Sequence, residues 1–168
     1  MSPVRLRRCL VHLLTGRGAV TRVLPQAAYV RVQSAIEGSE ASHSGELRFA
    51  VEAALDLPEL LRGLSARERA LQVFSELRVW DTEENNGVLI YVLLADKDFE
   101  IIGDRGIHGH VGAAGWEAIA QRMEQDFRAG EFERAVLHGV EEIGAVLRRH
   151  YPRRGPDLNE LPDAPVIL

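Results

Sequence analysis

A near-continuous apolar run over residues 88–94 is the feature that most constrains the fold of this chain. Turn-forming residues bound the run on both sides, at 85–87 and at 96–97. A short segment that is apolar at nearly every position is typical of a strand buried on both faces of a sheet. A second apolar segment at residues 99–102 follows the turn, so we expect a hairpin in which another strand returns beside the first.

Hydrophobic periodicity predicts the remaining elements. Residues 46–55 alternate between apolar and polar side chains, which indicates a strand with one buried face. Helices are expected from Pro25 to about residue 40, after a capping box at residues 65–68, and over residues 116–127 and 132–147. The order α-β-α-β-β-α-α, with a crossover helix joining two parallel strands, predicts an α/β fold, an α/β/α sandwich around a small mixed sheet.

Composition divides the chain into three parts. A basic N-terminal arm or helix covers residues 1–24, one folded domain is expected over residues 25–150, and a Pro-rich tail covers residues 151–168. The length of 168 residues fits a single domain with short extensions. We expect the tail to be either an extended strap or a mobile end.

The N-terminal 22 residues contain arginines and no acidic residue. Their apolar run at residues 9–14 is interrupted by His12, is too short to span a bilayer and lacks a small-residue cleavage site. The sequence therefore predicts no signal peptide and no transmembrane segment, and a cytoplasmic location. Two interpretations stay open for this segment: a helix packed on the domain, or a basic amphipathic stretch over residues 4–22 that touches a membrane surface.

Overall charge and cysteine content exclude some classes of function. The net charge of −5 argues against a nucleic-acid partner. Cys9 is the single cysteine, so no intrachain disulfide can form.

Three polar clusters should meet at one edge of the predicted sheet. One cluster, at residues 40–46, lies before the first strand, and a second, at residues 81–86, lies before the next strand. The third, at residues 104–108, follows the strand that the hairpin returns to the same edge. Because parallel strands begin at the same edge of a sheet, we expect all three clusters to lie together.

The chemistry of these clusters suits a divalent cation. Calcium and magnesium prefer carboxylate, amide and carbonyl oxygens. The predicted metal ligands are Asp81, Asn85, Asn86, Asp104, Glu46 and His43. Two alternatives stay open: the acidic loop is only a solvated turn, or His108 and His110, alone or with His43, bind zinc.

Arg105 is a candidate for binding an anion, since a cation and an arginine together would suit a phosphate group. None of the acidic, amide and basic residues singled out in the clusters is a serine or cysteine nucleophile, so any hydrolysis would use water activated by a metal. Asp81, Glu83 and Glu84 are candidate bases for that step. The sequence names no catalytic residue beyond these and leaves enzymatic activity open.

The sequence resembles the TPM-domain family. The matching residues are Asn85-Asn86-Gly87-Val88-Leu89 and Gly103-Asp104-Arg105-Gly106, with two helices after them. Asp81 matches an acidic position before the NNG motif, whereas Asp104-Arg105 replaces the aromatic residue of the family's G-Y-G-like element. The likeness extends over roughly residues 25–150 and is greatest to the short soluble form, without the signal peptide, membrane anchor and Gly-rich tail of many relatives.

This resemblance implies an α/β/α sandwich and calcium or magnesium near the NNG loop in some members. One member, in the thylakoid lumen, is tied to photosystem II repair and has been assigned acid phosphatase activity. The main hypothesis is a cation-binding module that acts with a membrane or protein partner in envelope maintenance or quality control. The alternatives are a weak metal-assisted acid phosphatase on phosphomonoesters and a purely structural interaction domain.

Overall fold

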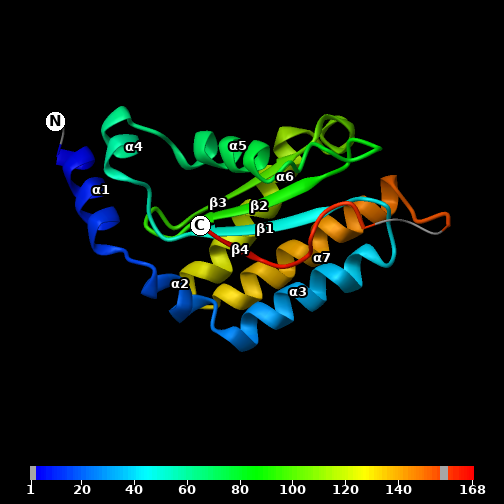
Figure 1. Cartoon of the computed structure of the whole chain (residues 1–168), viewed down its shortest axis with the longest axis horizontal. Coiled ribbons are helices and arrows are strands. Elements are labelled where there is room, and N and C mark those ends of the chain that lie inside the picture. Colours follow the sequence, from blue (N-terminus) through cyan, green and yellow to red (C-terminus); the bar gives the residue numbers. More distant parts are fainter. Residues whose placement is uncertain (1–2, 156–158) are drawn as a thin grey trace.

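A four-stranded mixed sheet lies between two layers of helices in the computed structural model, which describes residues 3–155 and 159–168 (Figure 1). The strands are β1 (Leu47–Glu52), β2 (Val88–Leu93), β3 (Asp98–Gly103) and β4 (Val166–Ile167). Their order across the sheet is β3-β2-β1-β4. Strand β1 is parallel to both β2 and β4, and β3 is antiparallel to β2. The predicted fold class is confirmed, as are the parallel pair and the hairpin.

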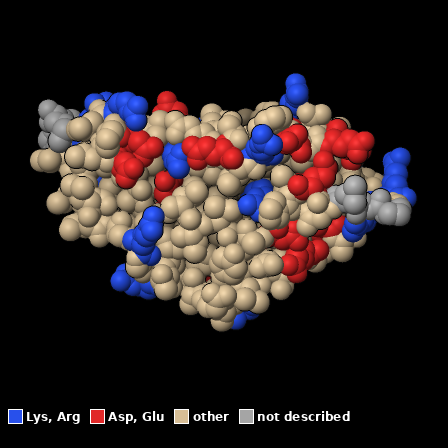
Figure 2. Space-filling view, viewed as in Figure 1, with Lys and Arg blue, Asp and Glu red and all other residues tan. Residues whose placement is uncertain are grey.

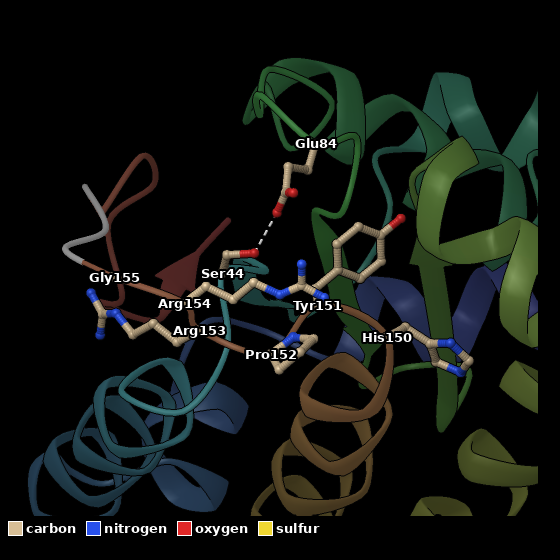
Figure 3. Close-up of a pocket in the computed structure, with 8 residues that line it drawn as sticks. All are labelled: Ser44, Glu84, His150, Tyr151, Pro152, Arg153, Arg154 and Gly155. Atoms are coloured by element: carbon tan, nitrogen blue, oxygen red, sulfur yellow. Dashed lines mark hydrogen bonds between the residues drawn. The ribbon is translucent and has the colours of Figure 1, made fainter.

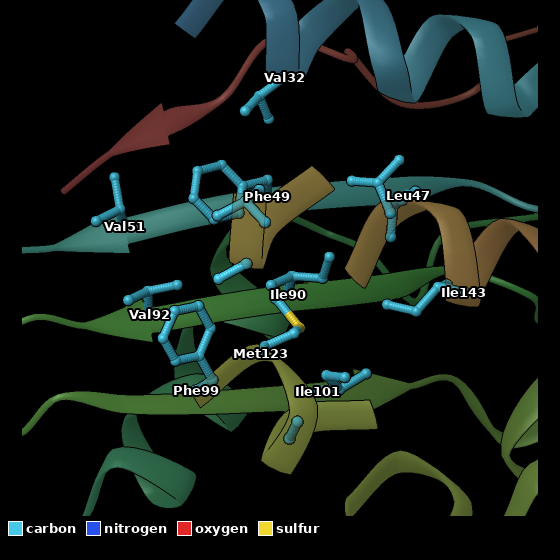
Figure 4. Packing of buried hydrophobic residues seen from close by; sticks show 14 of the residues in the cluster. Val32, Leu47, Phe49, Val51, Ile90, Val92, Phe99, Ile101, Met123 and Ile143 are labelled. Atoms are coloured by element: carbon cyan, nitrogen blue, oxygen red, sulfur yellow. The ribbon is translucent and has the colours of Figure 1, made fainter. Parts of the chain in front are cut away.

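Helices cover both faces of the sheet. They are α1 (Pro3–Leu14), α2 (Gly18–Val23), α3 (Gln26–Glu40), α4 (Leu57–Arg62), α5 (Ala66–Glu76), α6 (Arg105–Arg128) and α7 (Phe132–His150). Helices α2, α3, α6 and α7 build one hydrophobic core with the sheet, and α1, α4 and α5 build another on the opposite face. The larger core carries Phe49, Ile90 and Phe99 from three neighbouring strands (Figure 4). Burying side chains of this size contributes about 1.5–3 kcal/mol each before entropy costs are counted.

Strand β1 differs from its prediction because it is buried on both faces. Every residue from Leu47 to Val51 is buried, including Arg48, which was expected on a solvent face. Strand β1 is an inner strand, with β2 on one side and β4 on the other. Its polar residues consequently need internal partners. Glu52, for example, accepts hydrogen bonds from Tyr91 (2.6 Å) and Arg69 (2.9 Å).

Helix α6 begins about ten residues earlier than the sequence predicted. The sequence placed this helix over residues 116–127, after a stretch with several glycines, but the helix begins at Arg105 with Asp104 as its N-cap. Gly112 interrupts it with φ of 71° and ψ of 168°, values that glycine adopts without steric penalty. The glycines were therefore a signal for a kink inside one helix and not for a loop before it.

The tail forms an extended strap along the sheet, apart from residues 156–158, which lie outside the described residues. Pro152 makes a bridge with His43, and the backbone N–H groups of Glu160 and Leu161 bind the Glu46 carboxylate at 3.0 and 3.2 Å. The chain then adds β4 beside β1. Pattern reasoning missed both β4 and the short helix α4.

The N-terminal segment folds as a helix packed against the rest of the domain. Cys9 and His12 of α1 are buried, and Asp96 binds His12 at 2.9 Å and Arg8 at 2.7 Å. Within residues 3–155 and 159–168, no helix combines the length and the apolar character needed to cross a bilayer.

Candidate functional site

The three polar clusters do meet at one edge of the sheet, which we call the polar rim (residues 40–46, 81–87 and 104–108). The Asn86 side chain donates to the Ser44 carbonyl at 3.0 Å, which joins the first two clusters. The Arg105 side chain donates to Asn85 Oδ1 at 3.1 Å, and the Asp104 N–H donates to the Gly87 carbonyl at 2.8 Å. Residues far apart in the sequence are thus connected by direct hydrogen bonds.

Backbone contacts fix the shape of the NNG loop. Asn85 has a φ of 53°, a left-handed conformation that asparagine tolerates better than most residues. The Asn86 N–H donates to Thr82 Oγ1 at 3.1 Å, which closes the turn. Gly87 is required by space, because a Cβ there would lie 2.0 Å from the Val79 carbonyl oxygen. Gly106 faces a similar limit at 2.5 Å from the Asn85 carbonyl oxygen, so helix α6 lies directly against the loop.

Two buried oxygen atoms at the rim have no hydrogen-bond partner among the described residues: Asn86 Oδ1 and Asp104 Oδ2. The other side-chain atoms of both residues are used. Asn86 Nδ2 contacts Ser44 and Glu84, and Asp104 Oδ1 accepts from the Arg105 N–H at 2.7 Å. Buried oxygens are nearly always paired with protein, water or an ion, and leaving one unpaired costs about 1–3 kcal/mol. The two oxygens could therefore bind a hydrogen-bond donor or a cation, both of which accept electron density from oxygen.

Glu46 and His43 are engaged in holding the chain. Both Glu46 oxygens accept from the strap, and burial raises the pKa of this carboxyl. Nδ1 of His43 lies 2.9 Å from the Gly45 carbonyl, and Nε2 lies 3.0 Å from Ser39 Oγ. A carbonyl can only accept, so Nδ1 carries the proton. To bind a cation, His43 Nε2 would have to give up its contact with Ser39, and the Glu46 oxygens would have to serve the strap and the cation together.

The other two predicted metal ligands are Asp81 and Asn85. Asp81 has a side chain that is 56% exposed and a long contact, 3.9 Å, to Arg78. Asn85 and Arg105 bind each other through their side chains. No group of three or more His, Cys, Asp or Glu side chains that could hold a metal occurs in the described ranges. The ligand set proposed from the sequence, including the zinc alternative, thus stays a prediction.

Burial also changes the charge of the rim. Desolvation raises the pKa of Glu40 to about 9, although its Oε1 accepts from the Leu47 N–H at 2.8 Å. Glu40 is consequently neutral near pH 7, and the rim is less acidic than the sequence suggested.

A pocket of about 310 Å³ opens beside the rim (Figure 3). It is lined by Ser44, Glu84, His150, Tyr151, Pro152, Arg153, Arg154 and Gly155. The Ser44 hydroxyl donates to the Glu84 carboxylate across its wall, drawn as a dashed line in the figure. Burial, and then the charges of Glu84 and Asp104, raise the pKa of Tyr151.

Sequence reasoning found Glu84 as a candidate base but missed the other pocket residues. Ser44 precedes β1, whereas residues 150–155 follow α7, more than a hundred positions later. These segments share no motif. The basic run near the end of α7 was the only local signal, and it is equally typical of an ordinary helix C-terminus.

Comparison with known proteins identifies the family. The model of the TPM domain matches residues 20–146. The chain belongs to the TPM-domain family. The resemblance seen in the NNG and G-D-R-G motifs is therefore confirmed.

Two solved structures resemble this TPM domain. The BA42 protein of the psychrophilic bacterium Bizionia argentinensis, solved by NMR, is 30% identical, with a TM-score of 0.74 over 84% of this chain and 92% of that one. The N-terminal domain of a protein from P. gingivalis, also solved by NMR, is 18% identical, with a TM-score of 0.62 over 79% of this chain and 83% of that one. The second likeness concerns the fold alone. None of the curated proteins compared with the chain matches it.

Proposed function

We propose that this TPM domain binds a divalent cation, calcium or magnesium, at the polar rim. The observation that carries the proposal is the pair of buried oxygens without partners, Asn86 Oδ1 and Asp104 Oδ2. Both belong to hard ligands of the kind that calcium and magnesium prefer. As the family resemblance implies, the domain would act with a membrane or protein partner in envelope maintenance or quality control.

The residues present fit a weak site better than a strong one. Asp104 and Glu84 are the charged groups bonded to Asn86 or its neighbour Gly87, whereas the Glu46 carboxylate is occupied by the strap and Asp81 is exposed. Calcium affinity falls as the number of charged ligands decreases, so we expect a dissociation constant on the order of 10⁻⁴–10⁻³ M. Magnesium demands a smaller, more regular oxygen shell and should bind more weakly still.

Titration of the full chain with calcium and then magnesium, followed by amide NMR, tests the proposal. We expect saturable shifts at Asn86, Asp104 and their neighbours at millimolar ion. Absence of shifts at these amides would refute cation binding at the rim.

A matched pair of variants separates ligation from general charge effects. Asp104→Asn keeps an N-cap oxygen for α6 but removes one charge from the rim, so calcium binding should weaken about tenfold or more. Asp98→Asn removes a charge at the start of β3, the other end of that strand, and should leave binding unchanged. Equal losses in both variants would mean that calcium is attracted only by the net charge.

The pocket beside the rim favours one second candidate, a metal-assisted phosphatase. Arg153 and Arg154 line the pocket together with His150, and guanidinium groups recognise phosphate oxygens. A cation bound at the rim would supply polarisation of a phosphoryl oxygen and an activated water. Turnover of p-nitrophenyl phosphate should require calcium or magnesium and should fall strongly in Arg154→Ala. Turnover that survives both chelation and this substitution would come from a contaminant.

A further inference from the structure

The outward face of helix α1 carries an apolar stripe that the fold does not cover. Leu6, Leu10, Leu13 and Leu14 recur at the spacing of one helix face, and we call them the leucine stripe. Their exposed fractions are 60%, 57%, 66% and 77%. A surface helix of a globular protein normally turns such a stripe toward the core. An apolar stripe turned to solvent marks an interaction surface.

The inward face of α1 shows why the stripe points outward. Cys9 and His12 are buried there, and His12 Nδ1 accepts from the Leu55 N–H at 3.0 Å while Nε2 binds Asp96. Arg8 binds both Asp96 and the carbonyl of Leu64 at 2.8 Å. Rotating the helix to hide the leucines would break all of these bonds, so the orientation is fixed by polar contacts.

Helix α1 and the turn that follows it carry charged side chains of one sign only. Residues 1–36 contain six arginines and no acidic residue. Arg7 and Arg17 are exposed, whereas the acidic residues of the neighbouring helix α4, Asp56 and Glu59, cap that helix. In Figure 2, the end of the molecule that Figure 1 assigns to α1 is a mainly tan surface, with blue side chains at its edge and a red patch next to them.

We propose that the leucine stripe and the arginines beside it dock this protein on a membrane surface that contains anionic lipids. The leucines enter the boundary between headgroups and acyl chains, and the arginines contact lipid phosphates. Helix α4, which contacts α1, adds the exposed Leu57 and Leu61 to the same end of the molecule. Charge decides between lipid and a second copy, since pairing two α1 helices would bring like charges together.

Co-sedimentation of the full chain with vesicles tests this docking. Vesicles of phosphatidylcholine with roughly a third phosphatidylglycerol should bind the protein, and pure phosphatidylcholine vesicles should bind it at least about tenfold more weakly. Binding should also weaken as salt is raised, because the Debye length shortens.

Two sets of substitutions address the two parts of the surface. The triple variant Leu6→Gln, Leu10→Gln, Leu13→Gln should lose binding by about a hundredfold or more, whereas Val30→Gln, at a half-exposed apolar site on α3, should not. Each of Arg7→Gln and Arg17→Gln should cost about fivefold, and Arg149→Gln on α7 should cost nothing. If the triple variant does not fold, Leu14→Gln alone, at the most exposed position, replaces it and should also weaken binding.

Several outcomes would overturn the proposal. Wild-type protein that ignores anionic vesicles, or a folded leucine variant that binds as well as wild type, removes the stripe as a membrane contact. A third outcome concerns the oligomeric state, which light scattering measures in the absence of lipid. A wild-type dimer that becomes a monomer in the leucine variant would show that a second copy covers the stripe.

Discussion

The two ends of the sheet satisfy half-buried carboxylates in opposite ways. At the β2–β3 turn, both oxygens of Asp96 accept hydrogen bonds, at 3.0 and 2.7 Å from Arg8 and 2.9 Å from His12. At the polar rim, Asp104 has one oxygen bound to a backbone N–H and another without a partner in the described part of the chain. We call the contacts of Asp96 the closed network, because both of its oxygens are paired. The contacts of Asp104 form an open network, because one oxygen is unpaired.

The pKa of Asp96 shows the effect of pairing both carboxylate oxygens. Burial alone would raise it, but the hydrogen bonds and charges of Arg8 and His12 outweigh burial and keep the pKa below its usual range. A carboxylate satisfied in this way fastens α1 to the domain and offers nothing to a ligand. The comparison teaches that unsatisfied polar atoms, more than the number of acidic residues, distinguish a candidate site from a structural contact.

The largest effect should come from the scaffold of the rim. In Gly87→Ala the new methyl group would meet the Val79 carbonyl oxygen at 2.0 Å, so we expect a loss of about 3 kcal/mol in the free energy of unfolding. Gly109→Ala is the control, since a Cβ there has open space, and should stabilise the protein slightly. Urea denaturation measures both. A near-neutral Gly87→Ala would mean that the NNG loop is not held rigidly.

Opening the closed network should have the next largest effect. Asp96→Ala leaves Arg8 and the buried His12 without their shared partner, and we expect a loss of about 2 kcal/mol. Amide hydrogen exchange should show faster exchange throughout α1. If α1 stays protected in this variant, its apolar contacts, and not Asp96, hold it in place.

Glu40 makes the stability of the rim depend on pH up to the alkaline range. Its pKa of about 9 in the folded protein exceeds the ordinary 4.5, so the folded state retains a proton that the unfolded chain releases. The stability contributed by this group is complete below pH 4.5 and is lost as pH rises toward 9. Glu40→Gln should therefore become the more stable protein by about 1–2 kcal/mol at alkaline pH. Parallel stability curves for both proteins across this range would contradict the assignment.

The smallest effect should come from Asp81. Its side chain is exposed and its contact with Arg78 is long, so Asp81→Ala should change stability by less than about 0.5 kcal/mol. Thermal denaturation is sufficient to check this. A large loss would place Asp81 inside the rim's bonding network after all.

Local patterns predicted the parts of the fold that burial fixes locally. Strand β2 was predictable because both its faces are buried, which leaves a continuous apolar run. The capping box at Ser65 and Glu68 forms as expected. Strand β4 was not predictable, because two residues carry no periodicity and only their pairing with β1 makes them a strand. The burial of Arg48 was also not predictable, because the strap that covers it lies more than a hundred residues later in the sequence.

The candidate site divides in a similar way. Topology predicted that residues 40–46, 81–87 and 104–108 would meet, since parallel strands begin at one edge. Which atoms remain available could not be predicted, because that depends on partners such as Ser39 for His43 and the strap for Glu46. Residue type and spacing predict which residues lie near one another, whereas the hydrogen-bond partners of each atom follow only from the three-dimensional structure.

The strap has a consequence for the order of folding. Strands β1 and β4 pair through Ala50 with Val166 and Val51 with Ile167, so they close a loop of more than a hundred residues for two pairs. Contacts this distant in sequence form late, because loop closure must be achieved before pairing is gained. We expect the strap to dock last during folding and to detach first during native fluctuations. Its detachment would free both oxygens of Glu46, and the rim would then exist in a locked and an unlocked form that exchange without unfolding the domain.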